Sequence, residues 1–331
     1  MNSELEQSQI NENRHLFSLQ NLGRATGAII AAASPFIAST FSTEQTAYAA
    51  NTSEIVPSHT IELDSKLTTT KKVKPAPEST VSYGTDPSQF IDVYPSSVPE
   101  SHVVVLVHGG GFKSNPNSNL EVSTAKSLRN DGFTVFDTNY RGDDTTPAFP
   151  EEVQDIMSAT EYAINNAASY NGNSAEITLL GGSSGGLLVS MAGITLNAFK
   201  ANTVKSVVTL SGPSDFNSLL SYWSAIKGAH AEQHVKDELT ALGCVSVASC
   251  SISTENTWSP DRQVTSTNCP EDYLIINGTN EDMPVQQASE MNSALESDGC
   301  KTDYDVFPDT KHSFSYFSTV NSIVSSFIES N

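Results

Sequence analysis

The sequence predicts an α/β fold in which a mostly parallel central sheet is flanked by helices. From about residue 100 onward, short runs of β-branched and other apolar residues alternate with longer amphipathic stretches, and the apolar runs are nearly continuous. Strands that are apolar on both sides are buried on both faces, as in a parallel sheet between two layers of helices. The predicted strands are Phe90–Tyr94, Val103–Val107, Thr134–Asp137, Ile177–Leu180, Val204–Leu210, Tyr273–Asn277 and Tyr304–Phe307.

The stretches between these strands predict the helices, and one stretch breaks the alternation. Residues 213–268 contain no clear strand, and a structureless loop of that length is unusual inside a compact domain. We therefore expect a small helical cap insertion there, within a single domain of residues 79–331. The predicted helices elsewhere are Asn119–Asn130, Glu151–Ala167, Gly185–Phe199, Val285–Ser297 and Tyr316–Ser330.

The N-terminal residues have the pattern of an export signal. Arg14 and Arg24 precede the apolar stretch Ala25–Ala38, and Ala47–Ala49 fits a small-residue cleavage site. Residues 1–49 are therefore predicted to be a signal peptide, with an uncleaved N-terminal anchor as the alternative, and residues 50–78 a flexible linker. A formal net charge of −21 repels nucleic acid and anionic membranes. We expect a secreted protein with no nucleic-acid partner and no stable membrane insertion after cleavage.

Four cysteines in an exported chain predict two disulfides. Cys244 and Cys250 are close enough in sequence to close one loop. Cys269 and Cys300 each precede an apolar run, and adjacent parallel strands would bring the two within bridging distance. We expect the pairs Cys244–Cys250 and Cys269–Cys300, and no zinc site, because no cysteine and histidine spacing resembles one.

The segment Gly182–Gly186 has a serine with a glycine two residues to either side, after a predicted strand and at the start of a helix. In that setting the pattern indicates a strained turn that exposes a nucleophilic serine above the sheet edge. The spacing of the glycines selects Ser184 rather than Ser183. The helix N-terminus then supplies a positive dipole for a developing oxyanion, with the N–H of Gly185 as one donor.

Three consecutive glycines follow the predicted strand Val103–Val107. Such a segment frees backbone N–H groups to face a cavity, so Gly110 and Gly111 are predicted to complete an oxyanion hole. His108 directly precedes them and is expected to anchor this loop rather than to act as a base.

A general base is expected on the loop after the last strand, where His312 alone among the seven histidines has the right order and place. His230 and His234, four residues apart on a probable cap helix, are interpreted as a solvated face. The carboxylate that orients His312 should follow the preceding strand. Asp282 and Glu281 compete for this role, with a slight preference for Asp282 because the shorter side chain is the commoner solution.

The chain resembles the esterase/lipase group of the α/β-hydrolase superfamily, in particular its feruloyl-esterase-like and acetyl-esterase branch. The resemblance runs from Tyr83 to the C-terminus and departs from the pattern at the acid, where relatives typically read Gly-x-x-Asp-x-x-Val-Pro. Here the order is Pro284-Val285, and counting from the strand gives Glu281 the position of the family's Asp, whereas counting from the helix gives Asn280. The residues that carry the resemblance are Tyr83-Gly84, Asp86-Pro87, Asp92–Pro95, His108–Phe112, Asn139–Arg141, Phe149-Pro150, Asp155 and Gly182–Gly186.

The resemblance implies the α/β-hydrolase fold and a secreted serine carboxylic-ester hydrolase with a Ser-His-Asp/Glu triad and no cofactor or metal. Its substrate would be a small-molecule or polymer-linked ester. The alternatives are a serine peptidase or a formamidase/amidase with the same triad, and a non-catalytic binding module. The ester itself and the oligomeric state stay open at this point.

Overall fold

The structure, a computed structural model, describes residues 79–331 except 115–118 and 144. The predicted signal peptide (1–49) and linker (50–78) lie outside the described residues. Among the helices that are described, none is long and apolar enough to span a membrane.

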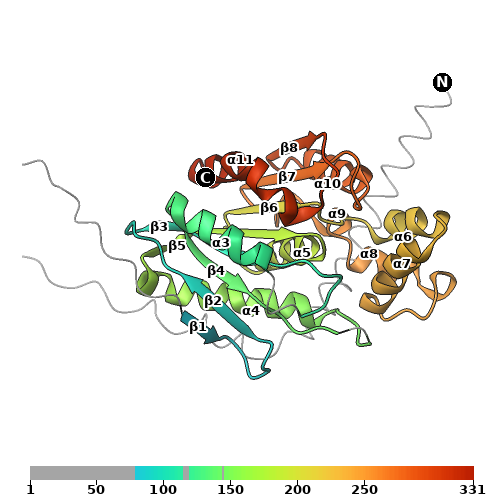
Figure 1. The fold of residues 1–331 in the computed structure, drawn as a ribbon, viewed down its shortest axis with the longest axis horizontal. Coiled ribbons are helices and arrows are strands. Elements are labelled where there is room, and N and C mark those ends of the chain that lie inside the picture. Colours follow the sequence, from blue (N-terminus) through green and yellow to red (C-terminus); the bar gives the residue numbers. More distant parts are fainter. Residues whose placement is uncertain (1–78, 115–118, 144) are drawn as a thin grey trace, which may run out of the picture. The chain divides into compact units, whose positions relative to one another are not determined.

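An eight-stranded sheet forms the centre of the described residues, with the strand order β1-β2-β4-β3-β5-β6-β7-β8 (Figure 1). β1 pairs antiparallel with β2, β2 pairs antiparallel with β4, and all pairs from β4 to β8 are parallel. The predicted mostly parallel sheet is therefore confirmed. The strands are β1 Ser79–Ser82, β2 Phe90–Tyr94, β3 Ser101–Val107, β4 Thr134–Thr138, β5 Gly172–Gly182, β6 Ser206–Leu210, β7 Asp272–Gly278 and β8 Thr302–Phe307.

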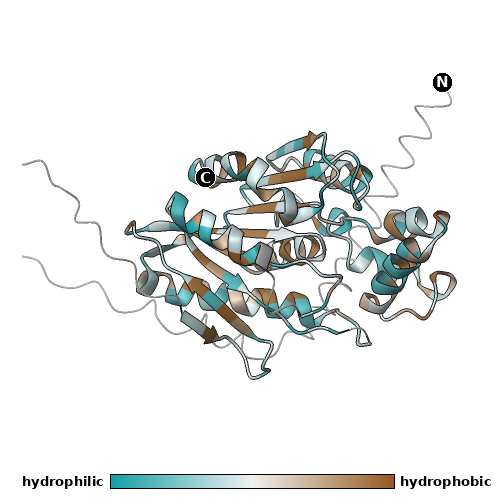
Figure 2. Cartoon of the chain, in the orientation of Figure 1, coloured by the Kyte–Doolittle hydropathy of each residue, from teal (hydrophilic) through white to brown (hydrophobic). Residues whose placement is uncertain are grey.

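Helices cover both faces of the sheet because its central strands are apolar on both sides. α3 and α11 contact each other on one face, and α4, α5 and α10 belong to the other face, where α4 contacts α5 (Figure 1). Every residue of β6 and β7 is buried, and Figure 2 shows the apolar residues concentrated in the central strands. The helices are α3 Asn119–Asp131, α4 Glu151–Asn166, α5 Ser184–Phe199, α10 Val285–Ser297 and α11 Phe317–Glu329, with the 3-10 helices η1 Ala167–Tyr170 and η3 Ser313–Tyr316.

The segment between β6 and β7 is helical and lies beside the sheet in Figure 1. Asp215 caps its first helix by accepting hydrogen bonds from the N–H groups of Asn217 and Ser218. Trp223 and Leu219 on that helix form a buried cluster with Ala231 and Met283, so the insertion packs against the loop after β7. The elements are α6 Phe216–Ala225, α7 Ala229–Ala241, η2 Val247–Ser249, α8 Ile252–Thr257 and α9 Pro260–Gln263.

Both predicted disulfides are present, Cys244–Cys250 in the insertion and Cys269–Cys300 before β7 and β8. The second pair follows from the sheet, because β7 and β8 are adjacent and parallel with Tyr273 opposite Thr302. The pairing predicted from strand order is therefore confirmed.

Candidate active site

The turn from β5 to α5 holds the candidate nucleophile. β5 ends at Gly182 and α5 begins at Ser184, so Ser183 alone forms the turn. Ser183 has φ +54° and ψ −130°, a conformation that non-glycine residues adopt only under strain. Its N–H donates to the Leu210 carbonyl (2.9 Å), and its own carbonyl accepts from the Gly186 N–H (2.8 Å). This is the strained strand-to-helix turn that the glycine pattern predicts, and its central residue is Ser183.

The geometry therefore favours Ser183 over Ser184, the serine selected from the sequence. Ser184 is the first residue of α5 and only 3% exposed, whereas Ser183 is partly exposed at the turn. Residues 181–186 read Gly-Gly-Ser-Ser-Gly-Gly, so the glycine spacing fits two frames. The frame Gly182–Gly186 is centred on Ser184, and the frame Gly181–Gly185 is centred on Ser183. Only the backbone conformation separates these frames. We take Ser183 as the candidate nucleophile in place of Ser184.

The glycine loop after β3 lies directly against this turn. A Cβ on Gly109 would come within 2.8 Å of the Gly182 carbonyl oxygen and 2.9 Å of Ser183 Cβ, so only glycine permits the approach. Gly110 and Gly111 have φ of +131° and +64°. Moving the nucleophile by one residue also moves the third oxyanion donor from Gly185 to the N–H of Ser184, which begins α5 and therefore has no intrahelical acceptor.

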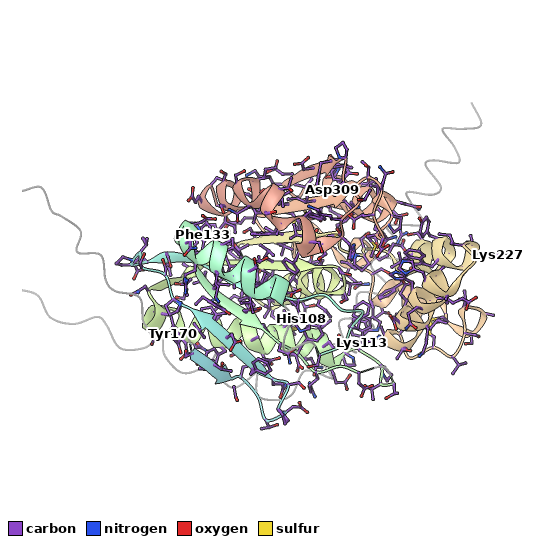
Figure 3. The ribbon with its side chains drawn as sticks, in the orientation of Figure 1. His108, Lys113, Phe133, Tyr170, Lys227 and Asp309 are labelled. Atoms are coloured by element: carbon purple, nitrogen blue, oxygen red, sulfur yellow. A yellow bond between two sulfur atoms is a disulfide. The ribbon has the colours of Figure 1, made fainter. Side chains whose placement is uncertain are left out.

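His108 anchors the glycine loop. Its ring nitrogens lie 2.8 Å from the Gly109 carbonyl oxygen and 2.9 Å from Asn139 Oδ1, and its ring stacks on Tyr140 at 4.3 Å between centroids. Burial lowers the pKa of His108, which disfavours its charged form. This environment suits a neutral structural side chain. Figure 3 shows His108 near the middle of the described residues, with Lys113 nearer the cap insertion.

His312 and Glu281 form the candidate base and acid. His312 follows β8, and its Nδ1 lies 2.5 Å from Oε2 of Glu281, whose side chain is fully buried. Glu281 Oε1 accepts a hydrogen bond from the Gly278 N–H (2.7 Å). A carboxylate with these bonds fixes the orientation of the imidazole and leaves Nε2 for proton transfer.

The base loop also contacts the nucleophile turn. A Cβ on Gly182 would overlap Ser313 Oγ and the Phe314 ring, so the residues after His312 lie over the residue before Ser183. The three candidate residues thus come from adjacent loops at the carboxyl edge of the sheet, where ligands bind in open α/β sheets.

Ser211, just after β6, was missed by the sequence analysis. Its hydroxyl donates to Glu281 Oε1 (2.7 Å) and accepts from the Ser313 N–H (3.1 Å), so one side chain joins the acid loop to the base loop. Tyr316 OH lies 2.8 Å from the same hydroxyl. Its sequence signal, a lone serine after a buried strand, is too common to single it out.

Asp282, the acid slightly preferred from the sequence, lies away from His312. Its side chain is 49% exposed, and its Oδ1 lies 3.1 Å from Nε2 of His230, which belongs to the cap insertion. The structure therefore brings Glu281, and not Asp282, to His312.

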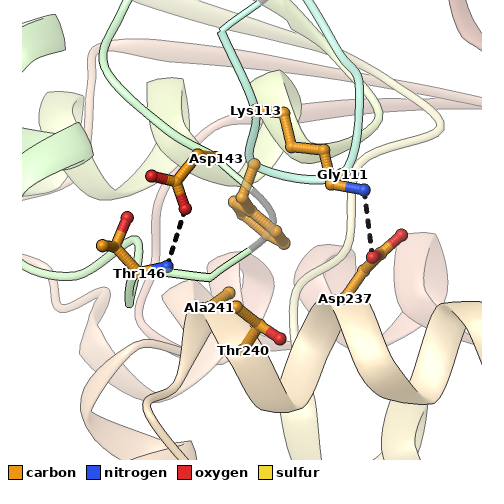
Figure 4. Close-up of a pocket in the computed structure, with 8 residues that line it drawn as sticks. Gly111, Lys113, Asp143, Thr146, Asp237, Thr240 and Ala241 are labelled. Atoms are coloured by element: carbon orange, nitrogen blue, oxygen red, sulfur yellow. Dashed lines mark hydrogen bonds and ion pairs between the residues drawn. The ribbon is translucent and has the colours of Figure 1, made fainter.

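A small polar pocket borders the glycine loop and the cap insertion (Figure 4). It is a shallow depression that encloses no room for a water-sized molecule, and Lys113 Nζ and Asp237 form an ion pair (3.1 Å) at its edge. Figure 4 also shows Asp143 accepting from the Thr146 N–H. The lining residues are Gly111, Phe112, Lys113, Asp143, Thr146, Asp237, Thr240 and Ala241.

A strained serine turn beside a glycine loop, on this sheet, defines the class of the esterase-type α/β hydrolases. The BD-FAE family model matches residues 91–295, more than half of the chain, so the chain belongs to the BD-FAE family. The predicted membership of the esterase/lipase group of α/β hydrolases is thereby confirmed. The match ends before His312.

Solved structures with the same fold carry esterase descriptions. A truncated carbohydrate esterase from gut microbiota has a TM-score of 0.62 at 22% identity, covering 77% of this chain and 96% of that one. Esterase B from Lactobacillus rhamnosis has a TM-score of 0.61 at 16% identity, covering 78% and 87%. An acetyl ester-xyloside bifunctional hydrolase from Caldicellulosiruptor lactoaceticus has a TM-score of 0.60 at 17% identity, covering 76% and 96%. No curated protein matches the sequence.

Proposed function

We propose that the chain hydrolyses carboxylic esters with Ser183 as nucleophile, His312 as general base and Glu281 as the orienting acid. The observation that carries this proposal is the 2.5 Å contact between His312 Nδ1 and the buried Glu281 carboxylate, on a loop that touches the strained serine turn. His312 Nε2 takes the proton of the Ser183 hydroxyl as its oxygen attacks the ester carbonyl carbon. The protonated imidazole then gives that proton to the leaving alcohol.

The backbone N–H groups of Ser184, Gly110 and Gly111 stabilise the oxyanion of the tetrahedral intermediate. The position of Ser184 at the start of α5 adds the positive end of the helix dipole. Water, activated by the same His312, then hydrolyses the acyl-enzyme and releases the acid. These steps require no metal or organic cofactor.

For the substrate, we propose a short acyl group on a polar alcohol such as a carbohydrate. The surface beside Gly111 is lined mainly by polar and charged side chains, including Lys113 and Asp237. Such a surface favours hydroxyl-rich groups over long alkyl chains, because burying the ion pair under an apolar chain would cost its hydration. The descriptions of the carbohydrate esterase and of the acetyl ester-xyloside hydrolase point to the same class.

We also propose that the protein is exported. The two disulfides support this, because disulfides persist mainly in oxidising compartments. N-terminal sequencing of the protein recovered from its own culture medium tests the proposal, with a start at residue 50 or 51 as the expected result.

Matched alanine variants of the two adjacent serines test the activity. Ser183→Ala is expected to lower kcat for p-nitrophenyl acetate by on the order of 10⁶-fold, since removing the nucleophile disables the whole triad. Ser184→Ala keeps the backbone N–H and is expected to retain most of the activity. Unchanged turnover by folded Ser183→Ala would overturn the proposal. Acetylated xylan and p-nitrophenyl octanoate, compared by kcat/KM, test the substrate class, and a preference for the octanoate would contradict it.

A further inference from the structure

The cap insertion and the loop after β7 bring three metal-ligating side chains together beside the candidate active site. His230 and His234 are four residues apart on α7 and so lie on one helix face, while Asp282 comes from the loop. One donor atom from each residue lies within 4.8 Å of the other two. His230 Nε2 and Asp282 Oδ1 are already 3.1 Å apart.

The surroundings hold part of this cluster in place. The ring of His234 stacks on Trp223 with 4.1 Å between centroids and 3° between planes, and Trp223 is only 4% exposed. Stacking restrains the plane of the His234 ring and leaves both nitrogens, which lie on the ring edge, outside the stack. The side chains of His230 and Asp282 are 65% and 49% exposed, so they can turn toward a common point, and an ion can reach them from solvent.

The donor set selects the kind of ion. Two imidazole nitrogens and one carboxylate oxygen suit zinc, whereas calcium and magnesium prefer oxygen ligands alone. A tetrahedral zinc site with ligand distances of about 2.1 Å places its donors about 3.4 Å apart. The donors here lie within 4.8 Å of one another, so the widest separation exceeds the tetrahedral value by at most about 1.4 Å, which rotation of exposed side chains can supply.

Contrary to the expectation from the sequence that there is no zinc site, we propose that His230, His234 and Asp282 bind a divalent transition-metal ion of the zinc type, with water at the remaining coordination position. The ion joins helix α7 of the cap insertion to the loop after β7. That loop already contacts the insertion through Met283, which is buried with Trp223, so the ion would reinforce an existing contact. Glu281 directly precedes Asp282 in this loop. The site is therefore a clamp between the cap and the loop that carries the candidate acid.

Zinc binding to the full chain, read without any substrate, tests this proposal independently of the esterase. After treatment with EDTA and removal of the chelator, calorimetric titration with ZnCl₂ should give one ion per chain. Zinc should also raise Tm, because it binds the folded state. His234→Ala and Asp282→Asn should each weaken binding by at least about 10- to 100-fold, since loss of an outer-shell partner alone often costs this much. Both variants should lose the zinc-dependent rise in Tm.

His102→Ala and Asp303→Asn are the matched controls, because they change the same residue types on strands β3 and β8. Both should bind zinc as the wild type does. Co²⁺ in place of zinc should give the visible absorption of a four-coordinate ion in the wild type and not in His234→Ala. The proposal would be overturned if the wild type failed to bind zinc. It would also be overturned if His234→Ala and Asp282→Asn bound zinc as tightly as the wild type.

Discussion

Replacing Glu281 with glutamine tests which acid orients the base. The side chain is fully buried and accepts from Gly278 N–H and Ser211 Oγ while facing His312 Nδ1 at 2.5 Å. A glutamine oxygen can keep the first two bonds, which leaves the amide NH₂ facing Nδ1. The imidazole must then present a lone pair there, so its proton moves to Nε2 and it can no longer act as the base.

The size of the effect follows from this loss of tautomer control. The corresponding change in a serine protease triad lowers kcat by about 10⁴-fold, or about 5.5 kcal/mol of transition-state stabilisation. Asp282→Asn removes only an exposed contact with His230, worth at most about 1 kcal/mol, so its loss should not exceed about fivefold.

The assay is steady-state hydrolysis of p-nitrophenyl acetate by both variants in the presence of EDTA, which keeps the cation site empty. Circular dichroism and Tm verify that each variant is folded. If Asp282→Asn lost as much activity as Glu281→Gln, or more, the assignment of the acid to Glu281 would be refuted.

Three further changes probe the site and its support. Ser211→Ala removes a hydrogen bond to the buried Glu281 carboxylate worth about 1.5–3 kcal/mol, so kcat should fall about 10- to 100-fold with little change in KM. A change confined to KM would contradict a role for Ser211 in holding Glu281 in place. Burial raises the pKa of Glu152 to about 10 from 4.5, so the folded state keeps a proton that the unfolded state releases. The free energy of unfolding of the wild type should therefore fall relative to that of Glu152→Gln between about pH 4.5 and pH 10, by up to about 1.4 kcal/mol per pH unit. Urea unfolding of both proteins at pH 5.5 and 7.5 measures this, and a difference between them that did not grow with pH would contradict it. Replacing the pair Cys269–Cys300 by serines should lower the free energy of unfolding by about 4 kcal/mol, against about 2 kcal/mol for Cys244–Cys250. The sequence separations are 31 and 6, and a disulfide that closes a longer loop removes more conformational entropy from the unfolded chain. Equal losses in urea unfolding would contradict this explanation.

Most of the sheet could be predicted because its strands are apolar on both faces. Phe90–Tyr94 and Val285–Ser297 were predicted with the bounds that the structure gives them. β1 was missed because Ser79–Ser82 is a short, half-exposed edge strand with no hydrophobic signal. β5 begins five residues earlier than predicted, because Gly172 pairs with Ser101 across an irregularity in register that no apolar pattern indicates.

The site was harder to predict because its residues are selected by backbone geometry. Two frames of glycine spacing are equal in sequence, and only the strained φ of Ser183 separates it from Ser184. Likewise, Glu281 and Asp282 are adjacent acids, and the turn after β7 directs one inward and the other to solvent. Chain order alone points to His312 as the candidate base, because it follows the last strand.

Mapping the covalent adduct of a fluorophosphonate tests the central claim most directly. The reagent reacts with an activated serine, and fragmentation of the labelled peptide by mass spectrometry distinguishes Ser183 from Ser184. We predict a single adduct on Ser183, retained in Ser184→Ala and absent in Ser183→Ala. An adduct on Ser184, or labelling of folded Ser183→Ala at the wild-type rate, would contradict the assignment.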